Sequence, residues 1–277
     1  DYSQQTSEKA VFYGPHWNSS GTNAIVQINS LNHKDRWFGD FDLETGKFKV
    51  LVTERDDAWL GGPDIVGVYS LSPTLIKWIS NDQFVFASER SGYSHLYVFD
   101  NGNIEALTQG NWEVRDAVLR RDKKKWLITA GKESPTQDHL YQISANGGKV
   151  EKISELIGRN NGVVSPNGKL VAIINSNNRQ LSDLYLKNIS EIGEGTRITV
   201  SGSSNYHEIN LIKPEVVSFQ HKDGKPVWAG LYKPAKQHPN RPALLHIHGG
   251  GYRQFSHEGW SVYGYAMHLS KINYFVQ

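Results

Sequence analysis

Residues 244–255 of this 277-residue chain read LLHIHGGGYRQF, an apolar run that leads into two histidines and three consecutive glycines. Glycine loses more backbone freedom on folding than any other residue, so three in a row indicate that the backbone itself has a functional role here. Without Cβ atoms in the way, its N–H groups can turn toward a developing oxyanion. His248, Gly249 and Gly250 are therefore candidate catalytic residues, forming half of an oxyanion hole for acyl transfer.

A phosphate-binding loop and a plain turn are the alternatives for this glycine run. The dinucleotide fingerprint G-x-G-x-x-G is not met, because Gly249, Gly250 and Gly251 are consecutive and the next glycine is Gly259. A Walker loop would need Gly-Lys-Ser or Gly-Lys-Thr, and the sequence has neither. A glycine turn without chemistry stays open at this point.

Other side chains near the loop are weaker candidates. His246 and His248 share one face of an expected strand, but without a nearby carboxylate cluster we expect a packed or hydrogen-bonded pair and no metal site. Tyr252 is a candidate substrate-binding residue at the edge of the site, or a surface aromatic. The stretch GWSVYG has one residue too many for Gly-x-Ser-x-Gly, so Ser261 is rejected as a nucleophile. No cofactor is predicted.

The elements around the loop are typical of an α/β unit. ALLHIH (243–248) reads as a buried parallel strand, and residues 259–272 carry Val262, Tyr265, Ala266 and Leu269 at helical spacing. NYFVQ (273–277) reads as the start of another strand. Upstream, residues 215–234 read as a hairpin around the turn dipeptide Asp223-Gly224. Strand, glycine loop, helix and strand in this order indicate the beginning of an α/β-hydrolase domain.

Most of the preceding chain is built from a repeat. HLYVFD, HLYQIS and DLYLKN place Leu96, Leu140 and Leu184 at intervals of 140 − 96 = 44 and 184 − 140 = 44 residues, and each copy is followed by a turn and a segment ending near Thr or Ser. Units of about 44 residues with four short strands fit the blades of a β-propeller, with the leucine packed between blades. About four such units fit between Asn23 and Ser204, and a weaker early copy matches Asp42 with Asp100. A β-sandwich is the alternative.

Composition narrows the functional classes. There is no cysteine, which excludes disulfides, thiolate zinc sites and cysteine nucleophiles. The net charge of +2 does not indicate binding to nucleic acid or to a membrane surface. The sequence has no run of 18 apolar residues that could span a bilayer. The first ten residues lack the pattern of a signal peptide. The compartment stays open, with a periplasmic or secreted location favoured over a cytoplasmic one.

Several stretches, in order, resemble the prolyl oligopeptidase family of serine peptidases, most closely its dipeptidyl peptidase IV branch. ASERSGYSHLYVFD (87–100) and LTQGNWEV (107–114) resemble blade segments of that family, and residues 242–254 resemble the end of its first hydrolase strands. The resemblance implies a mostly β fold: a partial β-propeller of about four-stranded blades (1–208), followed by the N-terminal strands and first helix of an α/β-hydrolase domain (209–277). It also places His248 where dipeptidyl peptidase IV members carry an oxyanion-stabilising tyrosine.

The resemblance further implies a serine exopeptidase that removes X-Pro or X-Ala dipeptides from peptide N-termini, with the propeller gating access. A peptide is the expected substrate partner and a homo-oligomer is possible. Because no Gly-x-Ser-x-Gly is present, the chain is expected to be an inactive fragment of such an enzyme. A non-catalytic propeller that binds a peptide or protein, and an acyl-peptide hydrolase or esterase, are the alternatives.

Three propeller side chains could also carry function. Glu89 and Arg90 could meet substrate in a central channel, but a solvated turn or an ion pair between blades is favoured. Trp112 is expected to pack between blades.

Overall fold

The structure of the chain is a computed structural model that describes residues 9–42, 45–61, 63, 75–249, 257–260 and 266–276. The chain forms two compact units, which we describe separately. Unit 1 contains residues 1–128 and 143–150, and unit 2 contains residues 129–142 and 151–277. Residues Gly250, Tyr252, Ser261, Val262 and Tyr265, which the sequence singled out, lie outside the described residues.

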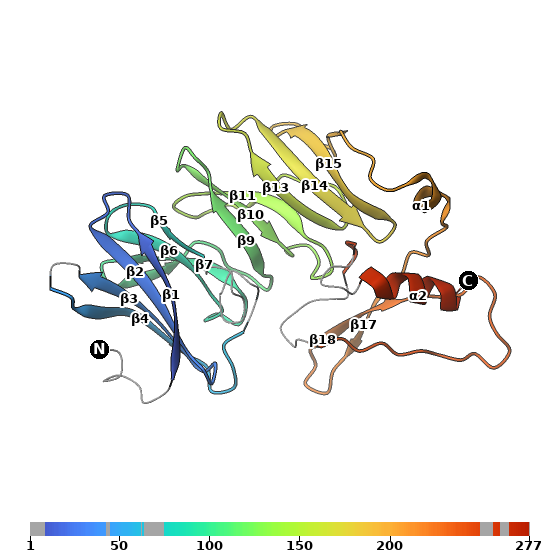
Figure 1. Cartoon of the computed structure of the whole chain (residues 1–277), viewed down its shortest axis with the longest axis horizontal. Helices are drawn as coiled ribbons and strands as arrows, with labels where there is room; N and C mark the ends of the chain where they lie inside the picture. Colours follow the sequence, from blue (N-terminus) through green and yellow to red (C-terminus); the bar gives the residue numbers. More distant parts are fainter. Residues whose placement is uncertain are drawn as a thin grey trace. The chain divides into compact units, whose positions relative to one another are not determined.

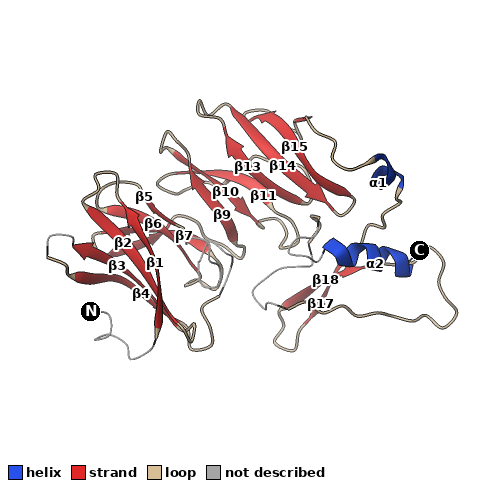
Figure 2. Ribbon diagram, in the orientation of Figure 1, coloured by secondary structure: helices blue, strands red, loops and turns tan. Residues whose placement is uncertain are grey.

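Four-stranded antiparallel sheets follow one another along the chain, each with its strands hydrogen-bonded in sequence order (Figure 1, Figure 2). The first two belong to unit 1. The first sheet consists of β1 (Ala10–Trp17), β2 (Asn23–Ser30), β3 (Asp35–Asp42) and β4 (Phe48–Arg55). The second consists of β5 (Ile76–Trp78), β6 (Gln83–Ser88), β7 (His95–Asp100) and β8 (Asn103–Ala106).

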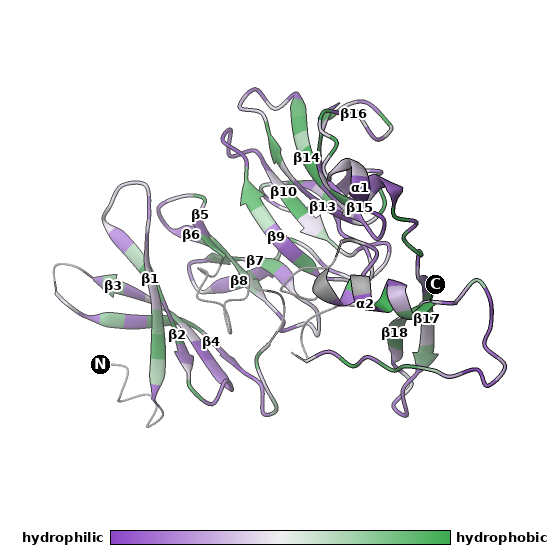
Figure 3. Ribbon diagram, turned by 45° about the vertical axis from the view of Figure 1, so that its right-hand side comes forward, coloured by the Kyte–Doolittle hydropathy of each residue, from purple (hydrophilic) through white to green (hydrophobic). Residues whose placement is uncertain are grey.

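Two more sheets of the same kind follow. The third sheet consists of β9 (Val114–Leu119), β10 (Lys125–Ala130), β11 (His139–Ser144) and β12 (Glu151–Lys152). The fourth consists of β13 (Arg159–Val164), β14 (Leu170–Asn177), β15 (Gln180–Asn188) and β16 (Thr196–Arg197), all in unit 2. The second strands β10 and β14 are hydrophobic over much of their length (Figure 3). This succession confirms the partial β-propeller, although the first sheet begins at Ala10, upstream of the predicted limit at Asn23.

The sequence repeat marks the third strand of each sheet. In two copies, a hydroxyl from the segment after this strand accepts the backbone N–H of the repeat leucine: Leu96 N lies 2.9 Å from Thr108 Oγ1, and Leu140 N lies 2.8 Å from Ser154 Oγ. In the last copy Leu184 N donates to Thr199 Oγ1 at 2.9 Å. The residue before each leucine contacts the same hydroxyl, through His95 Nδ1, His139 Nδ1 and Asp183 Oδ1 at 3.0, 3.3 and 3.0 Å. The repeat is therefore a hydrogen-bonding unit as well as an apolar one.

Neighbouring sheets pack through apolar faces. In unit 1, Ile25, Phe38 and Val52 of the first sheet form one buried cluster with Phe84 and Phe86 of the second. The rings of Phe38 and Phe86 lie 4.9 Å apart.

In unit 2, the buried Leu140 of β11 packs against Gly162 of β13, where an added Cβ would come within 2.6 Å of Leu140 Cδ1. Packing of the repeat leucine against the next sheet is what the propeller interpretation requires.

The C-terminal part of unit 2 contains α1 (Ser204–Glu208), the hairpin of β17 (Glu215–Gln220) and β18 (Pro226–Leu231), and α2 (Ala266–Val276). The predicted hairpin is confirmed, with Gly224 at a positive φ of 82° in its turn. The side chain of Asn273 on α2 accepts the backbone N–H of Ile212 at 2.8 Å, which ties the helix to the chain just before β17.

Two predicted elements are wrong. Residues 243–248 form no strand, and Leu244, Leu245 and Ile247 are exposed. A buried parallel strand needs strands on both sides, and the described residues provide none beside it. Residues 273–276 continue α2 instead of starting a strand. Without a neighbouring strand, a helix satisfies these backbone groups within the segment itself.

Candidate functional site

The predicted oxyanion loop is described up to Gly249. His248 is half-buried, and its Nδ1 donates to the carbonyl oxygen of Gly249 at 2.9 Å. Gly249 is exposed, and a Cβ added there would meet no heavy atom within 4 Å. The ring of His246 lies 5.0 Å from that of His268 on α2. Gly250 and Tyr252 lie outside the described residues, so their assignment stays a prediction.

The chain just after the glycine loop is held against the propeller loops of unit 2. The backbone N–H of Glu258 donates to the carbonyl oxygen of Thr136 at 2.7 Å, and the Glu258 carboxylate accepts a hydrogen bond from Gln137 Nε2. The Trp260 N–H lies 3.3 Å from Ser176 Oγ. Sequence reasoning missed these contacts, because only the fold brings together residues that are 84 and 121 positions apart.

Unit 1 contains a buried charged cluster that the sequence did not predict. The Glu54 carboxylate accepts hydrogen bonds from Arg36 Nε at 2.7 Å, from Arg90 Nη2 at 2.8 Å, and from Ser88 Oγ. Arg36 Nη2 also donates to the carbonyl oxygen of Ala87 at 3.0 Å. Arg90 thus makes an ion pair between blades, one of the two structural roles expected for it. The signal in the sequence was an arginine, Arg36, next to apolar buried positions of β3.

Burial and neighbouring charges shift the pKa values of carboxylates in and near this cluster. Burial by itself raises the pKa of Glu54, but the charge of Arg36 and the hydrogen bonds from Ser88, Arg90 and Arg36 together hold it below its ordinary value. Glu89 accepts the Gly61 N–H at 2.9 Å, yet burial still raises its pKa, with a further contribution from the charge of Glu113. Burial also raises the pKa of Glu113. The fold therefore favours the ionised form of Glu54 and disfavours the ionised forms of Glu89 and Glu113, relative to free carboxyl groups.

Trp112 has a packing role. Its indole is buried and meets the ring of His95 edge-on, with centroids 4.9 Å apart. An added Cβ on Gly110 would lie 2.3 Å from Trp112 Nε1, so the glycine makes room for this ring.

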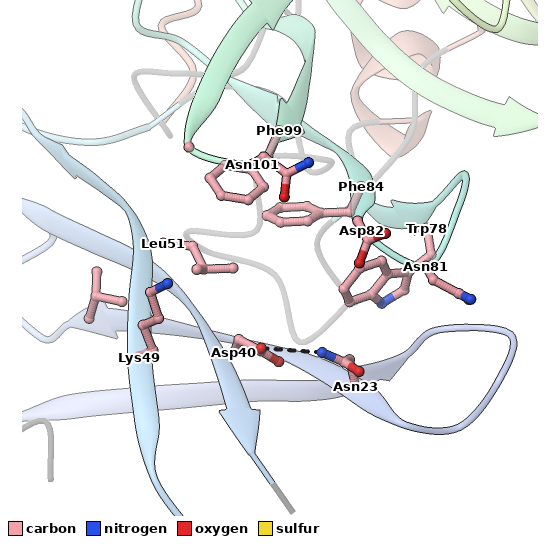
Figure 4. A pocket seen from close by; sticks show the side chains of 12 residues that line it. Asn23, Asp40, Lys49, Leu51, Trp78, Asn81, Asp82, Phe84, Phe99 and Asn101 are labelled. Atoms are coloured by element: carbon pink, nitrogen blue, oxygen red, sulfur yellow. Dashed lines mark hydrogen bonds between the residues drawn. The ribbon is translucent and has the colours of Figure 1, made fainter.

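A pocket of about 460 Å³ lies between the first two sheets of unit 1, at the end of the strands away from the charged cluster (Figure 4). Leu51, Trp78, Phe84 and Phe99 supply its apolar part, while Asp40 and other polar side chains line it as well. Trp78 is fixed by a hydrogen bond from its Nε1 to the carbonyl oxygen of His16 at 2.7 Å. Of the predicted site residues, the described ones, His248 and Gly249, do not line this pocket.

The sequence matches the family model of the dipeptidyl peptidase IV (DPP IV) N-terminal region over residues 3–181. The chain belongs to the dipeptidyl peptidase IV family. The match covers the four sheets up to the beginning of β15. Its relatives include dipeptidyl-aminopeptidases and a dipeptidyl peptidase, so the family is one of peptidases.

Individual relatives agree with this assignment. The chain is 30% identical to dipeptidyl-aminopeptidase B of Aspergillus niger over 124 residues, which is 42% of this chain and 14% of that protein. It is 27% identical to a "Probable dipeptidyl-aminopeptidase B" of Penicillium rubens over 258 residues, which is 84% of this chain and 27% of the relative. The chain thus spans roughly a quarter or less of these relatives.

A solved structure supports the fold. Dipeptidyl peptidase 4 of Porphyromonas gingivalis superposes with a TM-score of 0.70 at 18% identity, covering 91% of this chain and 35% of that one. At this identity the similarity establishes the architecture only.

No helix among the described residues is long and apolar enough to cross a membrane. No group of three or more His, Cys, Asp or Glu side chains in the described part of the chain could hold a metal ion.

Proposed function

We propose that this chain is part of a serine exopeptidase that removes X-Pro or X-Ala dipeptides from the N-termini of peptides. The observation that carries the proposal is the family match over residues 3–181, followed in the chain by a hairpin and a glycine loop. In this proposal residues 1–208 form the propeller segment that restricts access of peptides. Residues 209–277 begin the hydrolase domain.

The glycine loop has a defined role in the proposed reaction. A serine outside this chain attacks the peptide carbonyl, assisted by a histidine and a carboxylate, and the carbonyl oxygen becomes an oxyanion. The backbone N–H groups at Gly249 and Gly250, or the side chain of His248, donate to that oxyanion. The exposed, unobstructed backbone at Gly249 supports this role. Tyr252 contributes to the edge of the substrate site.

The 277-residue chain by itself is proposed to be inactive, because its sequence has no Gly-x-Ser-x-Gly nucleophile motif. An oxyanion loop stabilises charge only after a nucleophile has attacked, and it cannot start the reaction alone.

The test is a substrate comparison on the full-length protein that contains this chain. Ala-Pro p-nitroanilide should be hydrolysed, acetyl-Ala p-nitroanilide should be hydrolysed poorly, and p-nitrophenyl acetate should be turned over only slowly. Preference for the acetylated substrate would instead establish an acyl-peptide hydrolase, and preference for the ester an esterase. Turnover of Ala-Pro p-nitroanilide by the purified 277-residue chain would contradict the proposed inactivity, provided that a serine-reactive inhibitor profile excludes a contaminant.

A further inference from the structure

The pocket between the first two sheets of unit 1 has a preformed apolar side. The rings of Phe84 and Phe99 stack with centroids 5.0 Å apart, and Trp78 meets Phe84 edge-on at 5.6 Å. Leu51 and Trp78 pack against this buried cluster and are themselves half-buried. Because its Nε1 donates to the carbonyl oxygen of His16, Trp78 is fixed in this position. A fixed apolar wall beside a volume of about 460 Å³ is typical of small-molecule sites, which span roughly 300–1,000 Å³.

A carboxylate of the first sheet lines the same pocket and has few hydrogen bonds. Asp40 is half-buried, and its Oδ2 accepts a long hydrogen bond from Asn23 Nδ2 at 3.4 Å. Its Oδ1 is buried and has no hydrogen-bond partner in the part of the chain that the structure describes. Leaving a buried acceptor unmet costs free energy, so such a group favours a ligand that brings a donor. Rotation about the Cβ–Cγ bond of aspartate is soft, so either oxygen can turn toward that donor.

A positive charge lies next to this carboxylate without neutralising it. Lys49 of β4 is the cross-strand partner of Asp40 in β3, and both residues line the pocket. Opposite charges in this register commonly pair. Here the contact drawn for Asp40 goes to Asn23, and no ion pair joins Asp40 or Lys49 to another of the described residues (Figure 4). A second carboxylate, Asp82, is exposed at the rim between β5 and β6. The pocket therefore presents charges of both signs to a ligand.

Charges of both signs beside one apolar wall match a defined class of ligand. We propose that the pocket binds a zwitterionic molecule of dipeptide size. Its ammonium group donates to Asp40, its carboxylate pairs with Lys49, and its apolar side chain packs on Leu51 and Trp78. A neutral ligand would leave both charges unmatched, and a purely anionic one would face the two carboxylates of Asp40 and Asp82. The ligand class follows from the pocket itself, whether or not the proposed peptidase function holds.

The test is binding of the free dipeptide Val-Pro, measured by isothermal titration calorimetry on the full-length protein that contains this chain. The protein is first treated with a Val-Pro diphenyl phosphonate, which blocks the proposed serine site covalently and fills it with its own dipeptide, and excess reagent is removed. We expect saturable binding at one site. Acetyl-Val-Pro, which lacks the ammonium group, should bind at least about 10-fold more weakly. Val-Pro amide, which lacks the carboxylate, should bind about 2- to 5-fold more weakly, because Lys49 is exposed.

Three variants locate the binding in this pocket. Asp40→Asn keeps the size of the side chain, and it should weaken binding of Val-Pro about 10-fold or more without changing that of acetyl-Val-Pro. Lys49→Gln should weaken binding of Val-Pro about 2- to 5-fold and leave that of Val-Pro amide unchanged. Lys47→Gln is the matched control, because it removes an exposed lysine two positions away that does not line the pocket, and it should bind like the wild type.

The three ligands give a decisive result on the wild type alone, even if a variant fails to fold. No saturable binding of Val-Pro, or equal binding of Val-Pro and acetyl-Val-Pro, would overturn the inference. Equal binding of Val-Pro and Val-Pro amide would overturn it as well, because the site would then recognise an amine and not a zwitterion. With folded variants, an Asp40→Asn protein that binds Val-Pro as tightly as the wild type would place the ligand elsewhere. Failure of the untreated protein to hydrolyse Ala-Pro p-nitroanilide would contradict only the proposed peptidase function.

Discussion

Arg36 and Glu54 form an ion pair that is almost entirely buried between the first two sheets of unit 1, with side chains 1% and 7% exposed. Arg36 is the second residue of β3, the place that Leu96 and Leu140 occupy in β7 and β11. A charge buried at this place needs its own counter-charge. Burying two charges costs desolvation energy that offsets much of their attraction, so removing one partner should be more harmful than replacing both by apolar residues.

Breaking this pair should cost much more than replacing it. Glu54→Ala leaves the Arg36 charge buried beside Arg90, and we expect it to lower the free energy of unfolding by about 3–5 kcal/mol. The double variant Arg36→Leu with Glu54→Leu, which replaces both buried charges by apolar side chains, should lose far less. Urea unfolding of the wild type, Arg36→Leu, Glu54→Leu and the double variant completes a double-mutant cycle. Additive effects in that cycle would contradict the coupling.

The same carboxylate should make unit 1 acid-sensitive. The pKa of Glu54 is lower in the folded protein than in the unfolded chain, so its stabilising effect is fully present above the unfolded value. It is lost as the pH falls below that value and through the folded-state pKa. The difference in melting temperature between wild type and Glu54→Gln should therefore be large at pH 7 and shrink below about pH 4.5. A difference that stays constant with pH would rule out this origin.

The hydroxyls of the repeat should contribute measurably to stability. Thr108 is buried, accepts the Leu96 N–H at 2.9 Å and contacts His95 Nδ1 at 3.0 Å. Thr108→Val keeps the shape but leaves both groups unsatisfied, which should cost about 1–3 kcal/mol. Thr108→Ser keeps the hydroxyl and should lose less. Chemical denaturation of the three proteins checks the order, and a valine variant as stable as the serine variant would contradict it.

Close packing of the repeat leucine should show at Gly162. An alanine there would place its Cβ 2.6 Å from Leu140 Cδ1 and 2.8 Å from the carbonyl oxygen of Ala172. We expect Gly162→Ala to lower the free energy of unfolding by about 1–3 kcal/mol through overpacking. Gly249→Ala is the control in the same chain, because nothing lies within 4 Å of its new Cβ. Equal melting temperatures for the two variants would mean that β11 and β13 do not pack this closely.

Gly249 should matter in the full-length enzyme even though it is unimportant for the stability of this chain. If its backbone N–H faces the oxyanion, Gly249→Ala keeps this donor but places a methyl group beside the reacting carbonyl, and it should reduce kcat for Ala-Pro p-nitroanilide by about 10-fold, with little change in KM. Steady-state kinetics of wild type and variant give the comparison. An unchanged kcat would mean that the oxyanion site tolerates a side chain at position 249 and does not require glycine there.

The repeat and the hairpin could be predicted because their signals are local. The spacing of Leu96, Leu140 and Leu184 and the turn at Gly224 depend on residues close in sequence, and each sheet is a meander of neighbouring strands. The strand predicted at 243–248 failed for the opposite reason. Its apolar run is ambiguous until neighbouring strands cover it, and none of the described residues does so.

The sequence by itself determined the four-sheet propeller segment, the family, and the glycine loop as the place to look for chemistry. Only the tertiary structure decided how Arg36 and Glu54 are neutralised and how residues 257–260 attach to the loops at 134–138 and 176–178. Hydrophobic periodicity and turn residues act over a few positions, so they can be read along the chain. The pairing of buried charges and of distant backbone groups depends on which surfaces the fold brings together, and no local pattern encodes that.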